Sequence, residues 1–421
     1  MAARTSLLAL GWLAFFMADV RDGLGPFLAT YLQQARVQQE LIGYTMTAGG
    51  LAAVAMTPFA GAWVDRSHAK RAMTVAAALA VMAASAAAFS TLSGPVLIAS
   101  QLVTGVAGAV LAATMAALTL GLAKAAGFRR QIGRNEAASH AGNMLSAIAA
   151  GLAAALLGAP WLLAVMGAMT VGALLSVWAI RAEDIDHEAA RGSETSGAPA
   201  MASPDHAPLR TLLRNRPLLF FGLACAFFHL GNAAMLPLLN QRLAATVADS
   251  APLLWTGIAI VVAQLTMIPV ALWVARSRRF DVAWFVYGAI LVLPLRGALA
   301  YAFTSEWNNI PVQLLDGVAA GALGVATPLL VQRFTQGSGR FNTSLGFVMT
   351  LQGVGAALSP ALANTVVGAG QHFALAFAVL AAAALLALPF FWQAQRCAAR
   401  GAEEAQTVPG GAPGLSRRSR A

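Results

Sequence analysis

Long apolar runs separated by short polar connections dominate this chain. A helix that crosses the hydrocarbon layer of a membrane needs about 20 largely apolar residues, and twelve runs reach that length. The runs cover residues 6–33, 40–64, 72–92, 95–123, 133–157, 159–181, 215–242, 253–275, 281–304, 308–332, 341–369 and 371–395. Connections such as Ser93-Gly94-Pro95 are typical of antiparallel helical hairpins. The pattern predicts an all-α membrane protein with twelve spanning helices.

The two halves of the chain repeat one another. Residues 101–107 read QLVTGVA and residues 313–319 read QLLDGVA, an offset of 212. Gly11, Phe16 and Pro26 match Gly222, Phe227 and Pro237 at an offset of 211. Matches in the same order at nearly one offset indicate a helical unit used twice, which is typical of secondary transporters.

The duplication divides the chain into four parts. We expect an N-terminal six-helix bundle over residues 1–181 and a C-terminal one over 214–396, related by a pseudo-two-fold axis. Residues 182–213, rich in Gly, Ser, Ala and Pro, are expected to form a flexible linker. Residues 397–421 are expected to be a disordered tail.

Positive charges are distributed very unevenly between the two sides of this topology. Of the 27 Lys and Arg residues, 23 fall on the side that holds both termini and the linker, and only Arg36 and Arg242 fall on the other. Cytoplasmic loops carry the excess of positive charge in membrane proteins. We therefore expect both termini in the cytoplasm and an integral protein of a bacterial inner membrane, in contact with lipid and monomeric.

Composition excludes several other classes of protein. The chain is 58% hydrophobic and 10% charged, so it cannot cover itself with a polar surface. The net charge of +10 does not indicate nucleic-acid binding, because the charges lie in short clusters between apolar runs. Cys225 and Cys397 fit no metal spacing. No nucleophile–base pair or phosphate loop is evident, so we expect no enzyme activity, no cofactor and no bound metal.

The connection between the second and third runs carries a charged motif. Its sequence from Gly61 to Arg71 is GAWVDRSHAKR, and it resembles the loop signature G-x-L-a-D-r-x-G-r-k-r of the major facilitator superfamily. The matching residues are Gly61, Asp65, Arg66, Lys70 and Arg71. The second glycine of the signature is absent, and a degenerate copy follows over residues 271–279. The resemblance covers essentially the whole chain.

The resemblance implies a transporter that works by alternating access, with this loop as a latch for one state. Plain positive-inside topology is the other interpretation of the loop. We expect a secondary active transporter of a small organic solute, coupled to protons, with the direction open. Transport of a cation or metal complex is the first alternative, and a non-transporting membrane sensor is the second. Gln101 occupies the position of an arginine that proton-coupled exporters of this family often carry.

Ionisable residues inside a membrane are costly and are therefore candidates for function. Asp19, Arg21 and Asp22 lie in the first run, and Asp19 and Asp22 share a helical face. At 1.5 Å per residue, Asp19 lies about 20 Å into the run, near the centre of the membrane. The three residues are interpreted as a substrate-binding or proton-binding site, or else as an ionic staple between helices. Gly23, Gly25 and Pro26 predict a weak point in this helix.

The second half offers a smaller set of polar candidates. Asn232 corresponds to Arg21 at the 211-residue offset, and His229 lies one turn earlier. His229 is interpreted either as a titrating cavity residue or as a packing residue. Arg296 and Asp316 are each ten positions from Glu306 at a hairpin tip, so they lie at equal depth and are expected to form an ion pair. The pair is structural if it stays closed, and Asp316 also faces the expected cavity.

Further polar residues are minor candidates. In the fifth run, Glu136, His140 and Asn143 share a face and are expected to form a gate or interhelical hydrogen bonds. The others are Gln264, Gln352 and Asn364.

Overall fold

The fold is almost entirely helical. The structure, a computed structural model, describes residues 2–20, 24–190, 213–247, 250–277, 279–335 and 341–407. These residues contain no strand. The first half contains α1 (Ala2–Val20), α2 (Gly25–Gln34), α3 (Gln39–Arg66), α4 (Lys70–Ser90), α5 (Gly94–Leu157), α6 (Trp161–Ala179), the short η1 (Ala182–Asp184) and α7 (His187–Ala190). The second half contains α9 (Arg216–Asn232), α10 (Met235–Thr246), α11 (Pro252–Arg276), α12 (Val282–Ala302), η2 (Glu306–Asn308), α13 (Asn309–Phe334), α14 (Phe341–Val367), α15 (Phe373–Leu385) and α16 (Ala387–Thr407).

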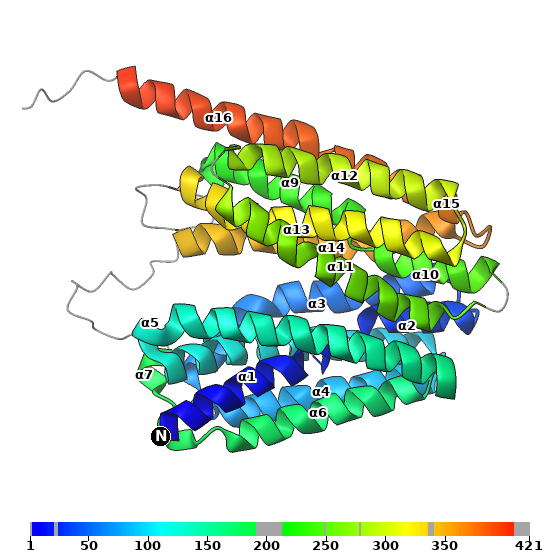
Figure 1. The fold of residues 1–421 in the computed structure, drawn as a ribbon, viewed down its shortest axis with the longest axis horizontal. Coiled ribbons are helices and arrows are strands. Elements are labelled where there is room, and N and C mark those ends of the chain that lie inside the picture. The colour runs from blue at the N-terminus through cyan, green and yellow to red at the C-terminus, as the bar shows by residue number, and fades with distance from the viewer. Residues whose placement is uncertain are drawn as a thin grey trace, which may run out of the picture.

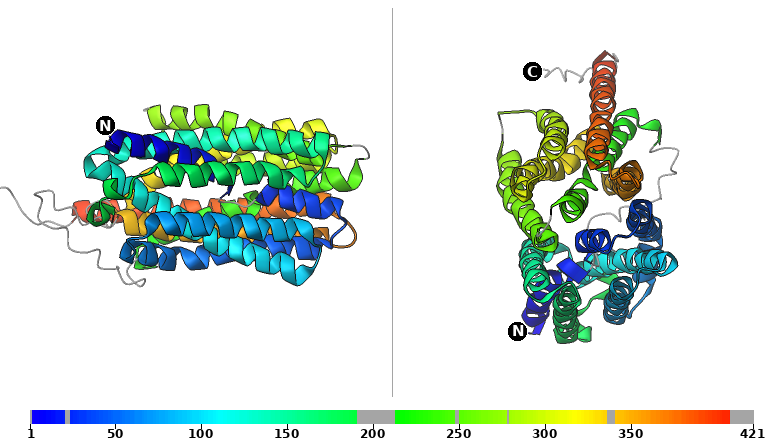
Figure 2. Two further views of the ribbon diagram at one scale, coloured as in Figure 1. Left: turned by 90° about the horizontal axis from the view of Figure 1, so that it is seen from below. Right: turned by 90° about the vertical axis from the view of Figure 1, so that its right-hand side faces the viewer.

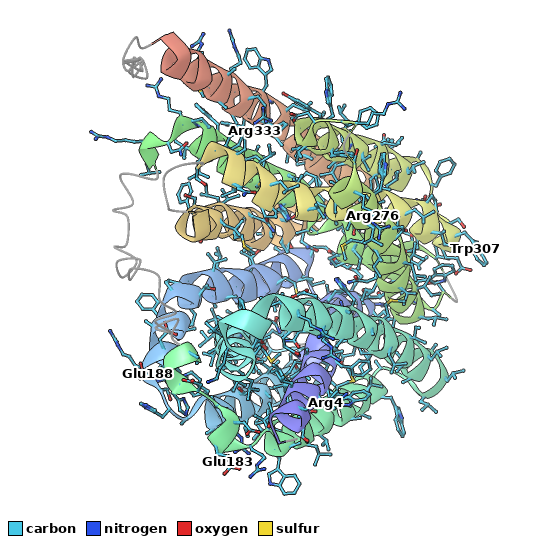
Figure 3. All side chains as sticks on the ribbon, turned by 60° about the vertical axis from the view of Figure 1, so that its left-hand side comes forward. Arg4, Glu183, Glu188, Arg276, Trp307 and Arg333 are labelled. Carbon is cyan, nitrogen blue, oxygen red and sulfur yellow. The ribbon has the colours of Figure 1, made fainter. Side chains whose placement is uncertain are left out.

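The helices form two bundles that lie side by side. The described residues 2–190, here called the N-half, occupy the lower part of Figure 1, and the described residues 213–407, the C-half, occupy the upper part. The end-on view in Figure 2 shows the same two groups of helices. α1 begins and α16 ends at one end of the molecule, here called the terminal end. The opposite end is called the distal end, and Figure 3 places Trp307 there, away from Glu183 and Glu188.

Eleven of the twelve expected spans are present as helices long and apolar enough to cross a membrane, within the described residues. The first span is the exception. α1 stops at Val20, and its apolar part, Arg4–Ala18, is too short. α2 then begins at Gly25, after Leu24 with φ 59°. Pro26 has no N–H to continue a helix, and a left-handed residue ends one. The weak point predicted in this span is therefore a true break.

A kink at Lys124 divides α5 into two spans, Gly94–Lys124 and Arg130–Leu157. Lys124 has φ 51° and its Nζ lies 3.0 Å from Asp186 Oδ2. The other carboxylate oxygen of Asp186 accepts hydrogen bonds from the backbone N–H groups of Glu188 and Ala189 at the start of α7. The Ala189 bond, followed by Lys124, lowers the pKa of Asp186. The expected linker over 182–213 thus begins with ordered turns, because Asp186 caps α7; residues 191–212 lie outside the described residues.

The expected boundary of the C-terminal tail also differs from the structure. α16 continues to Thr407, beyond the predicted boundary at Arg396. Residues 397–407 read CAARGAEEAQT, and Ala, Arg, Glu and Gln are strong helix formers. This local preference extends the helix past the apolar run. Residues 408–421 lie outside the described residues.

Each half has its own apolar core. Leu10, Leu13 and Val81 are among the fully buried residues of the N-half core. The C-half has two clusters, one around Phe221 and Phe391 and one around Phe377, Leu380 and Leu238. The cores are separate except at α11, where Leu253 joins the N-half core and Ile260 packs against it.

Glycines bring helices of the two halves into close contact. A Cβ at Gly50 of α3 would lie 2.7 Å from Ala357 Cβ of α14, and one at Gly43 would lie 2.7 Å from Pro360 O. In the same way, a Cβ at Gly257 of α11 would lie 2.4 Å from Ala147 O of α5. A real Cβ does not come this close, so a larger residue at these positions forces the halves apart.

Three hydrogen bonds join the described residues of the two halves. The hydroxyls of Thr30 and Thr256 lie 3.1 Å apart, and each hydroxyl also lies within hydrogen-bond distance of the carbonyl four residues earlier in its own chain segment. Thr47 Oγ1 accepts from Ala361 N at 3.0 Å. His140 Nδ1 and Gln264 Oε1 are 2.8 Å apart. These bonds and the glycine contacts lie toward the distal end or at mid-depth.

Toward the terminal end, α3 and α11 carry exposed aromatic side chains, and no hydrogen bond joins the described residues of the two halves there. On α3, Phe59 is 68% exposed and Trp63 is 56% exposed, and on α11 Trp273 is 56% exposed. The structure is therefore a conformer in which the halves are joined over the distal part of their interface.

Replacement of Gly50 by alanine is expected to weaken this conformer. The added methyl collides with Ala357, and relief requires α3 and α14 to separate at the distal end. In a cysteine-free background carrying Thr256→Cys, we expect faster maleimide labelling of the thiol in the Gly50→Ala variant. Gly288→Ala on α12 is the control, because no atom lies within 4 Å of its added Cβ. Equal labelling rates in both variants would contradict the expected separation.

Candidate functional site

The first helix of each half is interrupted at corresponding positions. α1 gives way to α2 between Val20 and Gly25, and α9 gives way to α10 between Asn232 and Met235. At the 211-residue offset the two junctions coincide, but Ala233 and Ala234 keep right-handed helical angles, so α9 and α10 together form one span, Arg216–Thr246. A broken helix exposes backbone carbonyls and N–H groups at membrane depth, where they are tolerated only if buried in protein or facing a cavity.

A cavity of about 220 Å³ lies between the halves beside the first break. Residues 24–27 form part of its wall, together with Asn143 of α5, Gln264 of α11 and Asp316 of α13. It is here called the central cavity. Asn143 and Gln264 are two of the polar residues that the sequence suggested as minor candidates.

Arg296 of α12 is fully buried and is held by groups from two neighbouring helices, α9 and α13. Its Nη1 lies 3.1 Å from Asp316 Oδ1 of α13 and donates to the side-chain oxygen of Asn232 on α9. Its Nη2 donates to Gln313 Oε1 at 3.2 Å, and its Nε donates to the carbonyl of Val312 at 3.2 Å. The equal depth inferred from the hairpin thus corresponds to an actual ion pair between Arg296 and Asp316.

Asp316 differs from Arg296 in its access to the cavity. Its side chain is 16% exposed, and it lines the central cavity. Oδ1 accepts from Asn232 Nδ2 at 3.0 Å as well as from Arg296. Oδ2 has no hydrogen-bond partner in the described part of the chain. One carboxylate oxygen is therefore fixed by two donors, and the other makes no hydrogen bond to the residues that the structure describes.

His229 lies in a second cavity, of about 310 Å³, which also contains Asn232 and Gln352. This cavity and the central cavity share Ala320 in their walls. His229 Nδ1 is 2.9 Å from the carbonyl of Cys225, so Nδ1 carries the proton of that bond. In the neutral ring, Nε2 is consequently an acceptor.

The acidic and basic residues of the first span lie outside the described part of the chain. This holds for the side chain of Asp19 in α1 and for Arg21 and Asp22. The structure describes the residues that flank them. Ala18 and Leu24, on either side of the three residues, both line the central cavity.

The residues of the charged loop motif between α3 and α4 differ in their burial and in their hydrogen-bond partners. Lys70 is fully buried, and its Nζ donates to the carbonyl of Ser67. Arg71 donates to the carbonyls of Val177 and Trp178 at the end of α6, where a cation is favourable. The side chains of Asp65 and Arg66 make no hydrogen bond or ion pair among the described residues. The remaining member of the motif, Gly61, has no side chain.

One further residue of the site, Gln313, is not among the candidates from the sequence, and it accepts a hydrogen bond from Arg296. The sequence carries a signal for it, because Gln313 opens the repeated motif QLLDGVA. His140 of α5 and Gln264, both minor candidates, bond to each other across the interface between the halves, which is the interhelical hydrogen bond expected of His140. Of the other minor candidates, Asn364 bonds only to the carbonyl of Pro360, and Glu136 lines a separate N-half cavity.

Replacement of Arg296 alone is expected to lower the stability of the folded protein strongly. Arg296→Met leaves Asp316, Asn232 and Gln313 without their common donor, and breaking a buried ion pair costs about 3–5 kcal/mol. The double variant Arg296→Met with Asp316→Asn removes the orphaned charge and should recover part of this loss. Thermal unfolding of the detergent-solubilised protein measures both; a double variant less stable than the single one would refute the pairing.

Comparison with known proteins agrees with this architecture. A sequence model described as Major Facilitator Superfamily matches residues 9–360. Uncharacterised MFS-type transporters from two strains of Mycobacterium tuberculosis are 43% identical over 367 residues, which cover 85% of this chain and 86% of each relative.

Solved structures show the same fold at low sequence identity. The nucleoside transporter NupG has a TM-score of 0.74 and 16% identity, over 92% of this chain and 98% of that one. A D-xylose-proton symporter has a TM-score of 0.67 and 15% identity, over 93% and 97%. Together with the match over most of its length, these similarities identify the chain as a member of the major facilitator superfamily, a family of membrane transporters and not of enzymes.

Proposed function

We propose that this protein is a proton-coupled secondary transporter of a small polar organic solute. The observation that carries the proposal is the Asp316 carboxylate. It is held by Arg296 and Asn232 among membrane-spanning helices, and it faces the cavity between the two halves. An ionisable group in this position is a functional candidate by default.

Protonation of Asp316 changes the balance of charge in the cluster. The ionised carboxylate compensates Arg296, which is fully buried. A proton on Oδ2 removes the negative charge and weakens the attraction to Nη1. Arg296 then depends on Asn232, Gln313 and the Val312 carbonyl, which come from two different helices. Proton binding thereby alters the contact between α9, α12 and α13, which links it to rearrangement of the C-half.

Alternating access supplies the transport step. The halves are joined distally in the described conformer, and the excess of positive residues favours a cytoplasmic location for the terminal end. We infer an inward-facing state of a monomer in a bacterial inner membrane. In this state Asp65 is exposed and makes no hydrogen bond or ion pair among the described residues, as expected for a latch that acts in the opposite state.

The solute is proposed to bind between the halves, with Asp19, Arg21 and Asp22 on one side and His229, Asn232 and Asp316 on the other. Cavities of about 220 and 310 Å³ fit small molecules. The alternative of a cation or metal complex gains no support from the described residues, among which no group of three His, Cys, Asp or Glu side chains could hold a metal ion.

Asp316→Asn is expected to abolish coupling to protons. Proteoliposomes loaded with the pH dye pyranine receive D-xylose, uridine or dialanine, and coupled transport appears as a solute-dependent change of internal pH. The asparagine keeps the shape and the bond to Asn232 but cannot take up a proton. The control is Asp281→Asn, which breaks only an exposed ion pair with Arg333. Solute-driven proton movement that persists in Asp316→Asn would overturn this assignment; binding without flux in the wild type would indicate a sensor.

The acids of the first span are tested in the same assay. The double variant Asp19→Asn with Asp22→Asn is expected to lower solute flux by at least tenfold or to flatten its pH dependence, because two acids near the membrane centre exceed what one arginine can neutralise. If both the flux and its pH dependence survive, these residues act only as an ionic staple.

A further inference from the structure

Two buried polar side chains in α5 lack hydrogen-bond partners. Gln101 is 4% exposed and Thr104 is 6% exposed. Neither Gln101 Nε2 nor Thr104 Oγ1 has a partner in the described part of the chain. A buried polar group without a partner costs about 1–3 kcal/mol, so two such groups one turn apart require an explanation.

Both side chains line one cavity of about 380 Å³ in the N-half. Much of its wall is glycine, with Gly25, Gly49, Gly50, Gly105 and Gly108 among the lining residues. Gln101 Oε1 lies 3.3 Å from the position a Cβ would take at Gly49. Gly49 therefore lets α3 pack closely against Gln101 at one side of the cavity. Gly25 also lines the central cavity, so the two cavities adjoin at the break in the first span.

The corresponding residues of the C-half both contact a cation, although Gln313 Nε2, like Gln101 Nε2, has no hydrogen-bond partner among the described residues. Gln101 corresponds to Gln313 and Thr104 to Asp316 in the repeated motif, and both C-half residues bind Arg296. At the 211-residue offset, Ser85 stands where Arg296 would be. The N-half thus keeps the glutamine of the motif without the cation that engages it in the C-half, and Gln101 is part of the wall of a cavity instead.

We propose that Gln101 and Thr104 form a subsite that binds a carbonyl or hydroxyl oxygen of an uncharged polar solute. The proposal rests on the proposed transport function and names the class of substrate. Gln101 Nε2 donates to that oxygen, and the Thr104 hydroxyl donates or accepts beside it. The described lining residues include no cation, so an anionic group would lack compensation there. Donor groups of the same solute face Asp316 Oδ2 in the adjoining central cavity.

The subsite makes an unusual prediction about stability. Gln101→Leu removes the unpartnered amide at nearly constant size, and Thr104→Val does the same for the hydroxyl. Both variants are expected to fold at least as stably as the wild type while binding solute less well. A residue that merely supports the fold would show the reverse, a lower Tm.

The experiment combines ligand-induced thermal shift with flux. The full-length protein is purified in detergent and tested against D-xylose, uridine and dialanine, and KM is then measured in proteoliposomes for each solute that raises Tm. For the solute that fits best, Gln101→Leu and Thr104→Val are expected to raise KM by about three- to tenfold each, the value of one neutral hydrogen bond. Thr104→Ser should restore binding. Thr114→Val is the matched control, since Thr114 is buried on the same helix and bonds only to the Leu111 carbonyl.

Deoxy analogues of the same solute identify the oxygen. An analogue that lacks the contacted oxygen should bind the wild type and Gln101→Leu equally well. Unchanged KM and unchanged thermal shift in both variants would overturn the subsite and mean that the two groups hold only water. A wild type whose Tm responds to neither D-xylose nor uridine would overturn the substrate class. A shift that depends on Gln101 but is accompanied by no flux would support the subsite and contradict transport.

Discussion

A guanidinium buried among membrane-spanning helices is tolerated only where its donors are paired, and Arg296 imposes this condition on the C-half. Its partners come from the end of α9, from a carbonyl of α13 and from two side chains on α13. The interruption of the first C-half helix, the register of the α12–α13 hairpin and the position of Asp316 all meet at this one side chain. Charge burial, which is expensive in hydrocarbon, thus fixes the geometry of the cavity wall.

Much of the architecture follows from the sequence, because apolar length and the placement of basic residues are strong signals in membrane proteins. Eleven spans, the broken first span and the depth match of Arg296 with Asp316 were all accessible from spacing alone. The ordered start of the linker was not, since it depends on Asp186 meeting Lys124 at a kink. The extension of α16 was missed because apolar content was used to end a helix that helix-forming residues continue.

The candidate site was less predictable than the fold, and the reason is the environment of individual atoms. A lone Asn232 or Gln313 in an apolar helix carries no sign of its partner, and the His140–Gln264 bond joins residues far apart in the sequence. Comparison of the two halves gave the most information. The repeat conserves a glutamine, at Gln101 and at Gln313. The two side chains differ in their surroundings, because Gln313 binds Arg296 and Gln101 is part of the wall of a cavity.

The pair Thr30 and Thr256 has a consequence for how the distal contact is released. Each threonine follows a proline by four residues, and each hydroxyl lies within reach of that proline's carbonyl, at 3.1 Å for Pro26 and 2.9 Å for Pro252. When the halves separate, both hydroxyls turn to their own helices and no polar group is stranded. The net loss is about one ordinary hydrogen bond, roughly 1 kcal/mol. A contact with such a fallback can be broken and remade in every transport cycle, because neither hydroxyl is left without a hydrogen-bond acceptor when the halves separate.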